Sequence, residues 1–230
     1  MAHLFALSAM LVHLATPTAG VSPQGQKTHP VDAAGGAIVA SVKPGRAVEL
    51  RSRPNGHSVG VLGSRTLYGS RLTLPVVKQH GDWLGVVSAA MPNGRLGWVN
   101  AKSDALAFGR VKLEVEADLS RRLLRVWAHG HVIKRFRVGI GRAGTSTPTG
   151  RFSITDKLRG RDYGSYYGCC ILALSGHQPH TPRGWTGGAR LAIHGGSYGA
   201  ASAGCLHAST RDLSYLMRMA PLGTQVVIHP

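Results

Sequence analysis

Acidic residues are scarce in this chain. Among 230 residues there are 10 Asp and Glu against 27 Lys and Arg, and no carboxylate lies between Asp162 and Asp212. A glycosidase normally needs two juxtaposed carboxylates, so the scarcity argues against that class of enzyme. It also leaves no acidic residue for a Cys-His-Asp triad built within that stretch. The formal charge of +17 at pH 7 favours contact with a polyanion.

Cysteine is scarce too. The three cysteines are Cys169, Cys170 and Cys205. They do not make a disulfide framework, because adjacent cysteines cannot bridge to each other without unusual backbone strain. The odd number instead suggests a free thiol, although cysteine is also a common small buried residue.

The chain also lacks an apolar run long enough for a membrane anchor. Its start, MAHLFALSAMLVHLATPTAG, is apolar only from Leu4 to about Ala15, which is too short to span a bilayer. The small residues that follow are typical of a secretory signal, although the usual leading Lys or Arg is missing. Residues 20–36 are rich in Gly, Pro and small polar residues and are expected to be a linker. We therefore expect residues 1–36 to be an export signal and linker, with no transmembrane anchor.

Signatures of nucleic-acid and metal binding are missing as well. Basic residues are scattered, and the longest basic run has two residues, as at Arg121-Arg122. There is no zinc-finger spacing, heptad seam or aromatic RNA-binding signature, so no specific nucleic-acid binding is expected. His177 and His180 have no Glu, Asp or third His at ligand spacing, so neither a metal site nor another cofactor is expected.

Residues 37–103 read as a small all-β module. Short apolar alternations are separated by turn signals, for example Pro54-Asn55-Gly56 and Pro92-Asn93-Gly94. The stretches AVELRSRPNGHSVGVL, GSRLTLPVVKQHGDWLGVV and GRLGWVNAK resemble the bacterial Src-homology-3-like domain. That resemblance implies a small β-barrel that binds wall peptides or positions a catalytic partner.

The rest of the chain, residues 108–230, is also predicted to be mainly β. Alternating apolar residues flank a turn at His129-Gly130, and ILAL after Cys170 marks a buried strand. Ser209 followed by Asp212 predicts a capped amphipathic helix that Pro221 ends. TQVVIHP then forms a final strand. The predicted fold class is mainly β, a small N-terminal barrel followed by a β-rich domain with one short C-terminal helix.

The candidate site is LAIHGGSYGAASAGCLHAS, residues 191–209. In RLAIH the alternation places His194 at the end of a strand, where it runs into Gly195-Gly196. Cys205 follows Ser202-Ala203-Gly204, whose backbone amides are candidates for stabilising an oxyanion. A thiol with an ordinary pKa needs a nearby base to be an efficient nucleophile, and His194 is a candidate for that base.

IHG followed by SAGC is similar to the motif of YkuD-like L,D-transpeptidases. The segment VGIGRAGTSTPTGRFSITDK resembles that family's Gly-x-x-x-x-Thr-Pro-x-Gly-x-Phe pattern, and ASTRDL after the cysteine resembles its helix start. The resemblance spans about residues 108–230. It implies that Cys205 attacks a wall stem peptide after its third residue, forming a thioester and releasing D-alanine, and that an amine of a second stem peptide then resolves the thioester.

The same resemblance implies that His194 activates the thiol and that Gly195 helps to orient the imidazole. Two positions differ from the family pattern, because Ala203 replaces a histidine and His207 replaces Arg or Asn. The segment between His194 and Cys205 is also shorter than usual. Since residues two apart on an extended segment face the same way, His207 is a rival base for Cys205.

Aromatic residues upstream of the site have two interpretations. Tyr166, Tyr167 and Trp185 either line the donor groove or pack in the interior. The expected partners are donor and acceptor peptidoglycan stem peptides, anionic cell-wall polymers and, as inhibitors, carbapenem β-lactams, with the protein outside the cytoplasm. Two other functions stay open: an L,D-carboxypeptidase that uses the same thioester, and a non-catalytic wall-binding protein. NlpC-type cysteine peptidases place the cysteine before the histidine, which is the reverse of the order here.

Overall fold

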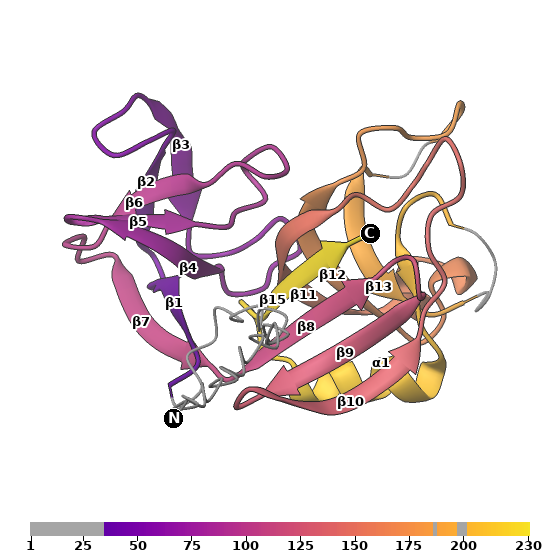
Figure 1. Ribbon diagram of the computed structural model, residues 1–230. Helices are drawn as coiled ribbons and strands as arrows, with labels where there is room; N and C mark the ends of the chain where they lie inside the picture. The colour runs from indigo at the N-terminus through magenta and orange to yellow at the C-terminus, as the bar shows by residue number, and fades with distance from the viewer. Residues whose placement is uncertain (1–34, 186–187, 197–201) are drawn as a thin grey trace, which may run out of the picture.

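The computed structural model describes residues 35–185, 188–196 and 202–230. Within them the chain forms two β-sheets that lie beside each other, with one α-helix against the second sheet (Figure 1). The predicted mainly β fold with one C-terminal helix is confirmed for these residues. The predicted export signal and most of the predicted linker lie outside them.

The N-terminal sheet has seven strands in the order β3-β2-β6-β5-β4-β1-β7. The strands are β1 (Ala37–Val42), β2 (Ala47–Arg51), β3 (Ser58–Gly63), β4 (Thr73–His80), β5 (Trp83–Val86), β6 (Gly97–Asn100) and β7 (Leu106–Val111). Its own core contains Val42, Leu50, Val86 and Val99, all fully buried. β3 and β7 are the edges of this sheet, so a closed barrel is not shown, and the Src-homology-3-like module stays a prediction.

The strands divide between the two sheets at Lys112, and the predicted domain boundaries at residues 103 and 108 stay predictions. Phe108 lies within β7, which pairs antiparallel with β1 along its whole length. The second sheet begins at Leu113. The apolar alternation continues across Lys112 without a turn signal, which is why the sequence pattern did not separate the two sheets.

The second sheet has eight strands in the order β10-β9-β8-β15-β11-β12-β13-β14. They are β8 (Leu113–Asp118), β9 (Leu123–Ala128), β10 (His131–Arg137), β11 (Gly150–Arg159), β12 (Cys170–His177), β13 (Arg190–His194), β14 (Leu206–His207) and β15 (Gln225–His229). The predicted final strand is confirmed as β15, in the middle of the sheet, parallel to β8 and antiparallel to β11.

Two local signals in the sequence are confirmed. His129 and Gly130 both have positive φ, 51° and 78°, as a two-residue type I′ turn between β9 and β10 requires. Helix α1 (Thr210–Met219) begins after Ser209, whose hydroxyl accepts a hydrogen bond from the Asp212 amide at 3.1 Å. Both are short-range features, so the sequence alone specified them.

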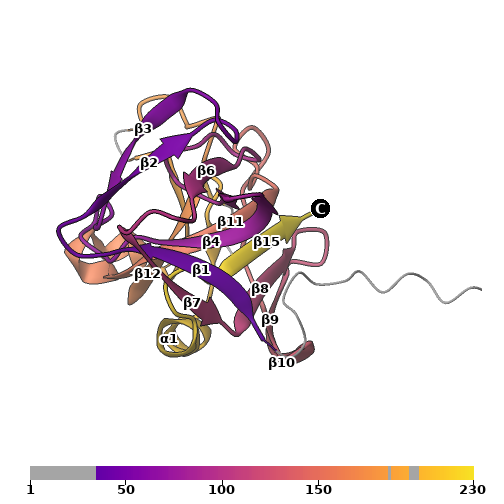
Figure 2. The same ribbon diagram turned by 90° about the vertical axis from the view of Figure 1, so that its left-hand side faces the viewer.

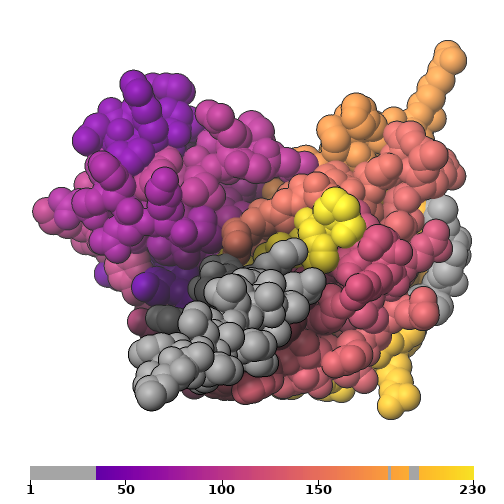
Figure 3. All heavy atoms as spheres, in the orientation of Figure 1, coloured from indigo at the N-terminus to yellow at the C-terminus, as the bar shows by residue number. Residues whose placement is uncertain are grey.

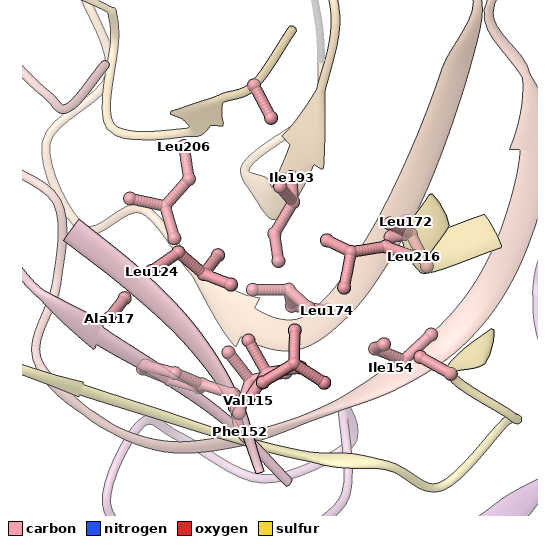
Figure 4. Close-up of a cluster of buried hydrophobic side chains, with 14 of the residues drawn as sticks. Val115, Ala117, Leu124, Phe152, Ile154, Leu172, Leu174, Ile193, Leu206 and Leu216 are labelled. Carbon is pink, nitrogen blue, oxygen red and sulfur yellow. The ribbon is translucent and has the colours of Figure 1, made fainter. Parts of the chain in front are cut away.

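Helix α1 and the second sheet enclose the main hydrophobic core (Figure 4). Leu213 and Leu216 of α1 are fully buried. They belong to the same cluster as buried side chains of the sheet, which include Val115, Leu124, Phe152, Ile154, Leu172, Leu174, Ile193 and Leu206. Ile193 of β13 and Leu206 of β14 are both part of this core. The core therefore anchors the strand that carries His194 and the strand that begins directly after Cys205.

Polar contacts join the N-terminal sheet to the second one, where the two lie against each other in Figures 2 and 3. The Asn93 side chain donates to the His177 carbonyl at 2.6 Å and accepts from the His177 amide at 2.9 Å. The Thr66 hydroxyl donates to the buried carboxylate of Asp156. In the described part of the chain no helix has the length and hydrophobicity to cross a membrane.

Truncating the main core tests this packing. Leu174 is fully buried, so Leu174→Ala is expected to lower the free energy of unfolding by about 3 kcal/mol, through lost burial and the cavity left behind. Urea denaturation followed by circular dichroism measures the change. Leu67→Ala is the matched control, because Leu67 is 85% exposed and is expected to change the free energy of unfolding by less than about 0.5 kcal/mol. Equal losses in the two variants would contradict the packing described.

Candidate active site

The parallel pairing of two neighbouring strands brings His194 and Cys205 into one pocket. β13 ends at His194, and β14 begins at Leu206, directly after Cys205. The register pairs Ile193 with Leu206 and His194 with His207. The eleven-residue separation in sequence therefore becomes adjacency across a sheet edge. The side chains of His194 and Cys205 line the same pocket.

The His194 imidazole is buried and held in one tautomer. Its Nδ1 atom lies 2.8 Å from the Gly195 carbonyl oxygen, which can only accept, so Nδ1 carries the proton. Nε2 is then the basic nitrogen, and it has no hydrogen-bond partner among the described residues. Burial and the neighbouring His207 lower the pKa of His194 to about 4, against a smaller raising effect of the bond to Gly195. At neutral pH the ring is uncharged and can accept a proton.

Cys205 is half-buried, and its thiol is protonated at rest. Burial raises its pKa to about 11, and a hydrogen bond from the backbone of Ala192 in β13 opposes that rise. The resting pair is therefore a neutral thiol and a neutral imidazole. It differs from the thiolate–imidazolium pairs that give some cysteine enzymes a strongly lowered thiol pKa.

A tight turn before Cys205 is fixed by side chains on both sides. The Ser202 hydroxyl donates to the Cys205 carbonyl at 2.6 Å and accepts from the Gly204 amide at 2.9 Å. The Gln178 side-chain amide donates to the Ala203 carbonyl at 2.9 Å. The Gly204 amide is thus hydrogen-bonded to Ser202, and its role toward an oxyanion stays a prediction. In the structure Ser202 and Gly204 hold the turn that carries Cys205.

The glycines after His194 serve a neighbouring loop. Gly195 donates its amide to the Tyr167 carbonyl at 3.1 Å. Gly196 has φ of 90°, and a Cβ there would collide with the Tyr166 carbonyl. Both glycines lack a side chain that would fill this space. In the structure they let the short 3₁₀ helix η2 (Ser165–Tyr167) approach the histidine strand.

That loop surrounds the imidazole with aromatic rings. The ring centres of Tyr166 and Tyr167 lie 5.3 Å and 5.0 Å from that of His194. The ring of His207 lies 4.3 Å from the His194 ring and is almost fully buried, with 1% exposed. Tyr166 and Tyr167 line the pocket together with Trp185, which is 39% exposed, whereas His207 does not line it. The geometry therefore places His194, and not His207, on the pocket side with Cys205.

The sequence matches a family model over this second sheet. The model describes the YkuD L,D-transpeptidase catalytic domain and matches residues 112–228, more than half of the chain. The chain belongs to the YkuD family. This is a family of L,D-transpeptidases, which are acyltransferases acting on peptidoglycan.

Similar proteins come from several bacteria. A protein of Bacillus licheniformis named as a putative L,D-transpeptidase YkuD is 29% identical over 127 residues, 52% of this chain and 67% of that protein. The solved structure of Bd1075 from Bdellovibrio bacteriovorus is 20% identical, with a TM-score of 0.42, over 51% of this chain and 48% of that one. L,D-transpeptidase 3 from Mycobacterium tuberculosis, solved with a faropenem-derived adduct, is 15% identical, with a TM-score of 0.40, over 59% and 73%. The match thus spans about half the length of Bd1075.

Some residues of this YkuD-family site gave no signal in the sequence. Gln178 lies between His177 and His180, the two histidines considered above as a metal pair. Its side-chain amide donates to the carbonyls of Ala203 and Thr145 and so joins the turn before Cys205 to the loop before β11. His177 instead contacts the N-terminal sheet, with Nε2 2.8 Å from the Ala89 carbonyl. The described ranges contain no group of three or more His, Cys, Asp or Glu that could hold a metal ion. Cys169 and Cys170 are half-buried and pack against the main core.

The neutral pair predicts a specific pH dependence for the thiol. Because the pKa of Cys205 is raised to about 11, the thiolate fraction should rise about tenfold per pH unit from pH 6 to pH 9.5. The rate of Cys205 alkylation by iodoacetamide, followed by peptide mass spectrometry, should rise in proportion. A free cysteine derivative is the control and should level off above its pKa of about 8.5. A plateau for Cys205 beginning near pH 7 would indicate a thiolate–imidazolium pair and contradict the neutral one.

Proposed function

We propose that this protein is a peptidoglycan L,D-transpeptidase that links third-position residues of adjacent stem peptides through a thioester on Cys205. The observation that carries the proposal is the pair itself. A half-buried thiol and an imidazole with a free basic Nε2 line one pocket, and the protonated Nδ1 is fixed by Gly195. Such a pair suits nucleophilic attack assisted by a general base.

Acylation begins with transfer of the thiol proton. As Cys205 Sγ attacks the carbonyl carbon of the third residue, His194 Nε2 takes the proton that the sulfur loses. Collapse of the tetrahedral adduct breaks the bond to D-alanine, and His194 returns the proton to the leaving amine. The thioester then remains on Cys205. The lowered pKa of His194 suits this role, because an imidazolium formed in this buried place readily gives its proton up.

Deacylation repeats these steps in reverse order with a second nucleophile. An amine of an acceptor stem attacks the thioester carbonyl, loses a proton to His194 and forms the new amide bond as Cys205 leaves and regains its proton. Water in place of the amine would give L,D-carboxypeptidase activity with the same residues. Tyr166, Tyr167 and Trp185 line the pocket and are proposed to contact the donor peptide.

The proposed place of action is the cell wall, outside the cytoplasm. A formal charge of +17 favours association with anionic wall polymers, which would concentrate the enzyme at its substrate. The partners are then the donor and acceptor stem peptides. Carbapenem β-lactams, as acylating agents, are proposed to react with the same thiol.

Intact-protein mass spectrometry tests the nucleophile. Exposure of the protein to a carbapenem or to a stem tetrapeptide is expected to give a covalent adduct on the wild type and none on Cys205→Ser. Cys170→Ser is the matched control and should still form the adduct, because Cys170 packs against the core and its pKa is raised to about 12. An adduct that persists in Cys205→Ser would overturn the mechanism. The absence of any adduct on the wild type would favour a non-catalytic wall-binding protein.

The two histidines make a second test. His194→Ala is expected to lower the acylation rate by about 10²- to 10⁴-fold, the usual contribution of a general base. His207→Ala is expected to lower the acylation rate by less than about tenfold. His207 does not line the pocket, and its ring lies against the ring of His194. Stopped-flow acylation with a chromogenic β-lactam measures both. Abolition by His207→Ala together with a mild effect of His194→Ala would reverse the assignment.

A further inference from the structure

The pocket of Cys205 has a wall that the second sheet does not provide. Tyr68 lines it together with Cys205, His194 and Tyr167. Tyr68 lies in the connection between β3 and β4 of the N-terminal sheet. The remaining lining residues come from positions 158 to 205. One aromatic side chain of the N-terminal part of the chain therefore reaches the proposed donor site.

The turn that carries Tyr68 has a fixed shape. The Thr66 amide donates to the Ser70 carbonyl at 2.9 Å, and the Gly69 amide donates to the Thr66 carbonyl at 3.0 Å. Gly69 has φ of 84°, which only glycine adopts readily. Within this turn Leu67 is 85% exposed, whereas Tyr68 is partly buried. The turn thus directs Tyr68 toward the second sheet and Leu67 toward solvent.

The turn is also tied to the second sheet by a buried contact. The Thr66 hydroxyl, two residues before Tyr68, donates to Asp156 of β11, a residue with no exposed surface. The Tyr68 ring meets the ring of Tyr163 edge-on, with centres 6.1 Å apart. Because a buried carboxylate that loses its hydrogen-bond donor is costly, the contact to Thr66 resists displacement of the turn.

A second junction fixes the N-terminal sheet at a distance from the turn. Asn93 makes two hydrogen bonds to the backbone of His177, and the His177 ring reaches the Ala89 carbonyl. With two separate attachments, the N-terminal sheet cannot easily rotate about either one. The position of Tyr68 relative to Cys205 is therefore determined by the docking of the two sheets.

Tyr68 also affects the pKa values of two other residues that line the pocket, Arg190 and Tyr167. Arg190 of β13 lines the pocket, and its guanidinium donates to the Leu174 carbonyl and, at 2.9 Å, to the Thr155 hydroxyl. Burial lowers the pKa of Arg190, and Tyr68 partly opposes that effect. Tyr68 also contributes to the raised pKa of Tyr167, after burial and Cys205. These effects agree with the place of Tyr68 in the pocket wall beside Tyr163.

We propose that Tyr68 is a substrate-positioning residue, whose ring forms the wall of the pocket against which the donor stem peptide lies. The N-terminal part of the chain then contributes directly to substrate binding, because it supplies one of the side chains that line the pocket. This inference rests on the proposed function, since its substrate is the same donor peptide. The ring face suits the flat peptide groups and aliphatic carbons of an extended chain. A small thiol reagent needs no such wall.

Kinetics of the full chain with a stem tetrapeptide test the proposal. Tyr68→Ala is expected to raise KM about tenfold with kcat changed less than about twofold, the loss of one well-packed ring contact in binding. Tyr68→Phe keeps the ring and should restore KM to within about twofold of the wild type. Leu67→Ala, in the same turn but pointing to solvent, is the matched control and should leave KM unchanged. Iodoacetamide alkylation of Cys205 should have the wild-type rate in Tyr68→Phe and Leu67→Ala.

The outcomes separate the inference from the proposed function. An unchanged KM in Tyr68→Ala, or an equal rise in Leu67→Ala, would overturn the role of Tyr68 while leaving the Cys205 chemistry in place. Failure of the wild type to release D-alanine or to form a thioester would overturn the proposed function, and the inference with it. If thermal unfolding shows that Tyr68→Ala does not fold, Tyr68→Leu, which keeps apolar volume without a ring face, replaces it with the same expected rise in KM.

Discussion

The parallel pairing of β13 with β14 is the constraint on which the site depends. It sets His194 beside the strand that follows Cys205, and it does so at the edge of a sheet whose other strands are locked into the main core. A parallel pair needs a connection that leaves the sheet and returns to it, and here that connection contains both the glycines after His194 and the turn before Cys205. Ser202, bonded to the Cys205 carbonyl and the Gly204 amide, fixes the return.

Burial then determines the chemical state of the pair. Removing both groups from water disfavours their charged forms, so the thiol pKa rises and the imidazole pKa falls. A carboxylate beside the histidine would raise the imidazole pKa, but the sequence has no carboxylate between Asp162 and Asp212. The Gly195 carbonyl orients the ring without adding a full charge. The result is a pair that is neutral at rest.

The N-terminal sheet and the YkuD-family domain are more closely joined than two modules on a flexible linker. Val39 of β1 is part of the main core, and Asn93 and Thr66 make polar contacts across the junction. His177 has a structural role at this junction, because its ring and its backbone both contact the N-terminal part of the chain. Docking of this kind is what allows Tyr68, distant in sequence, to take part in the pocket.

The sequence by itself determined the features that depend on neighbouring residues. Local backbone preferences explain the turn at His129-Gly130, the cap of α1 at Ser209 and the alternation that ends at His194. The motifs around Cys205 indicated the family. Only the tertiary structure decided that the second sheet begins at Leu113 and that the Gly204 amide bonds to Ser202. It also decided that Gln178 holds the cysteine turn and that Tyr68 lines the pocket. Each of these depends on which segments lie side by side after folding, and strand pairing across many residues leaves no short-range pattern in the sequence.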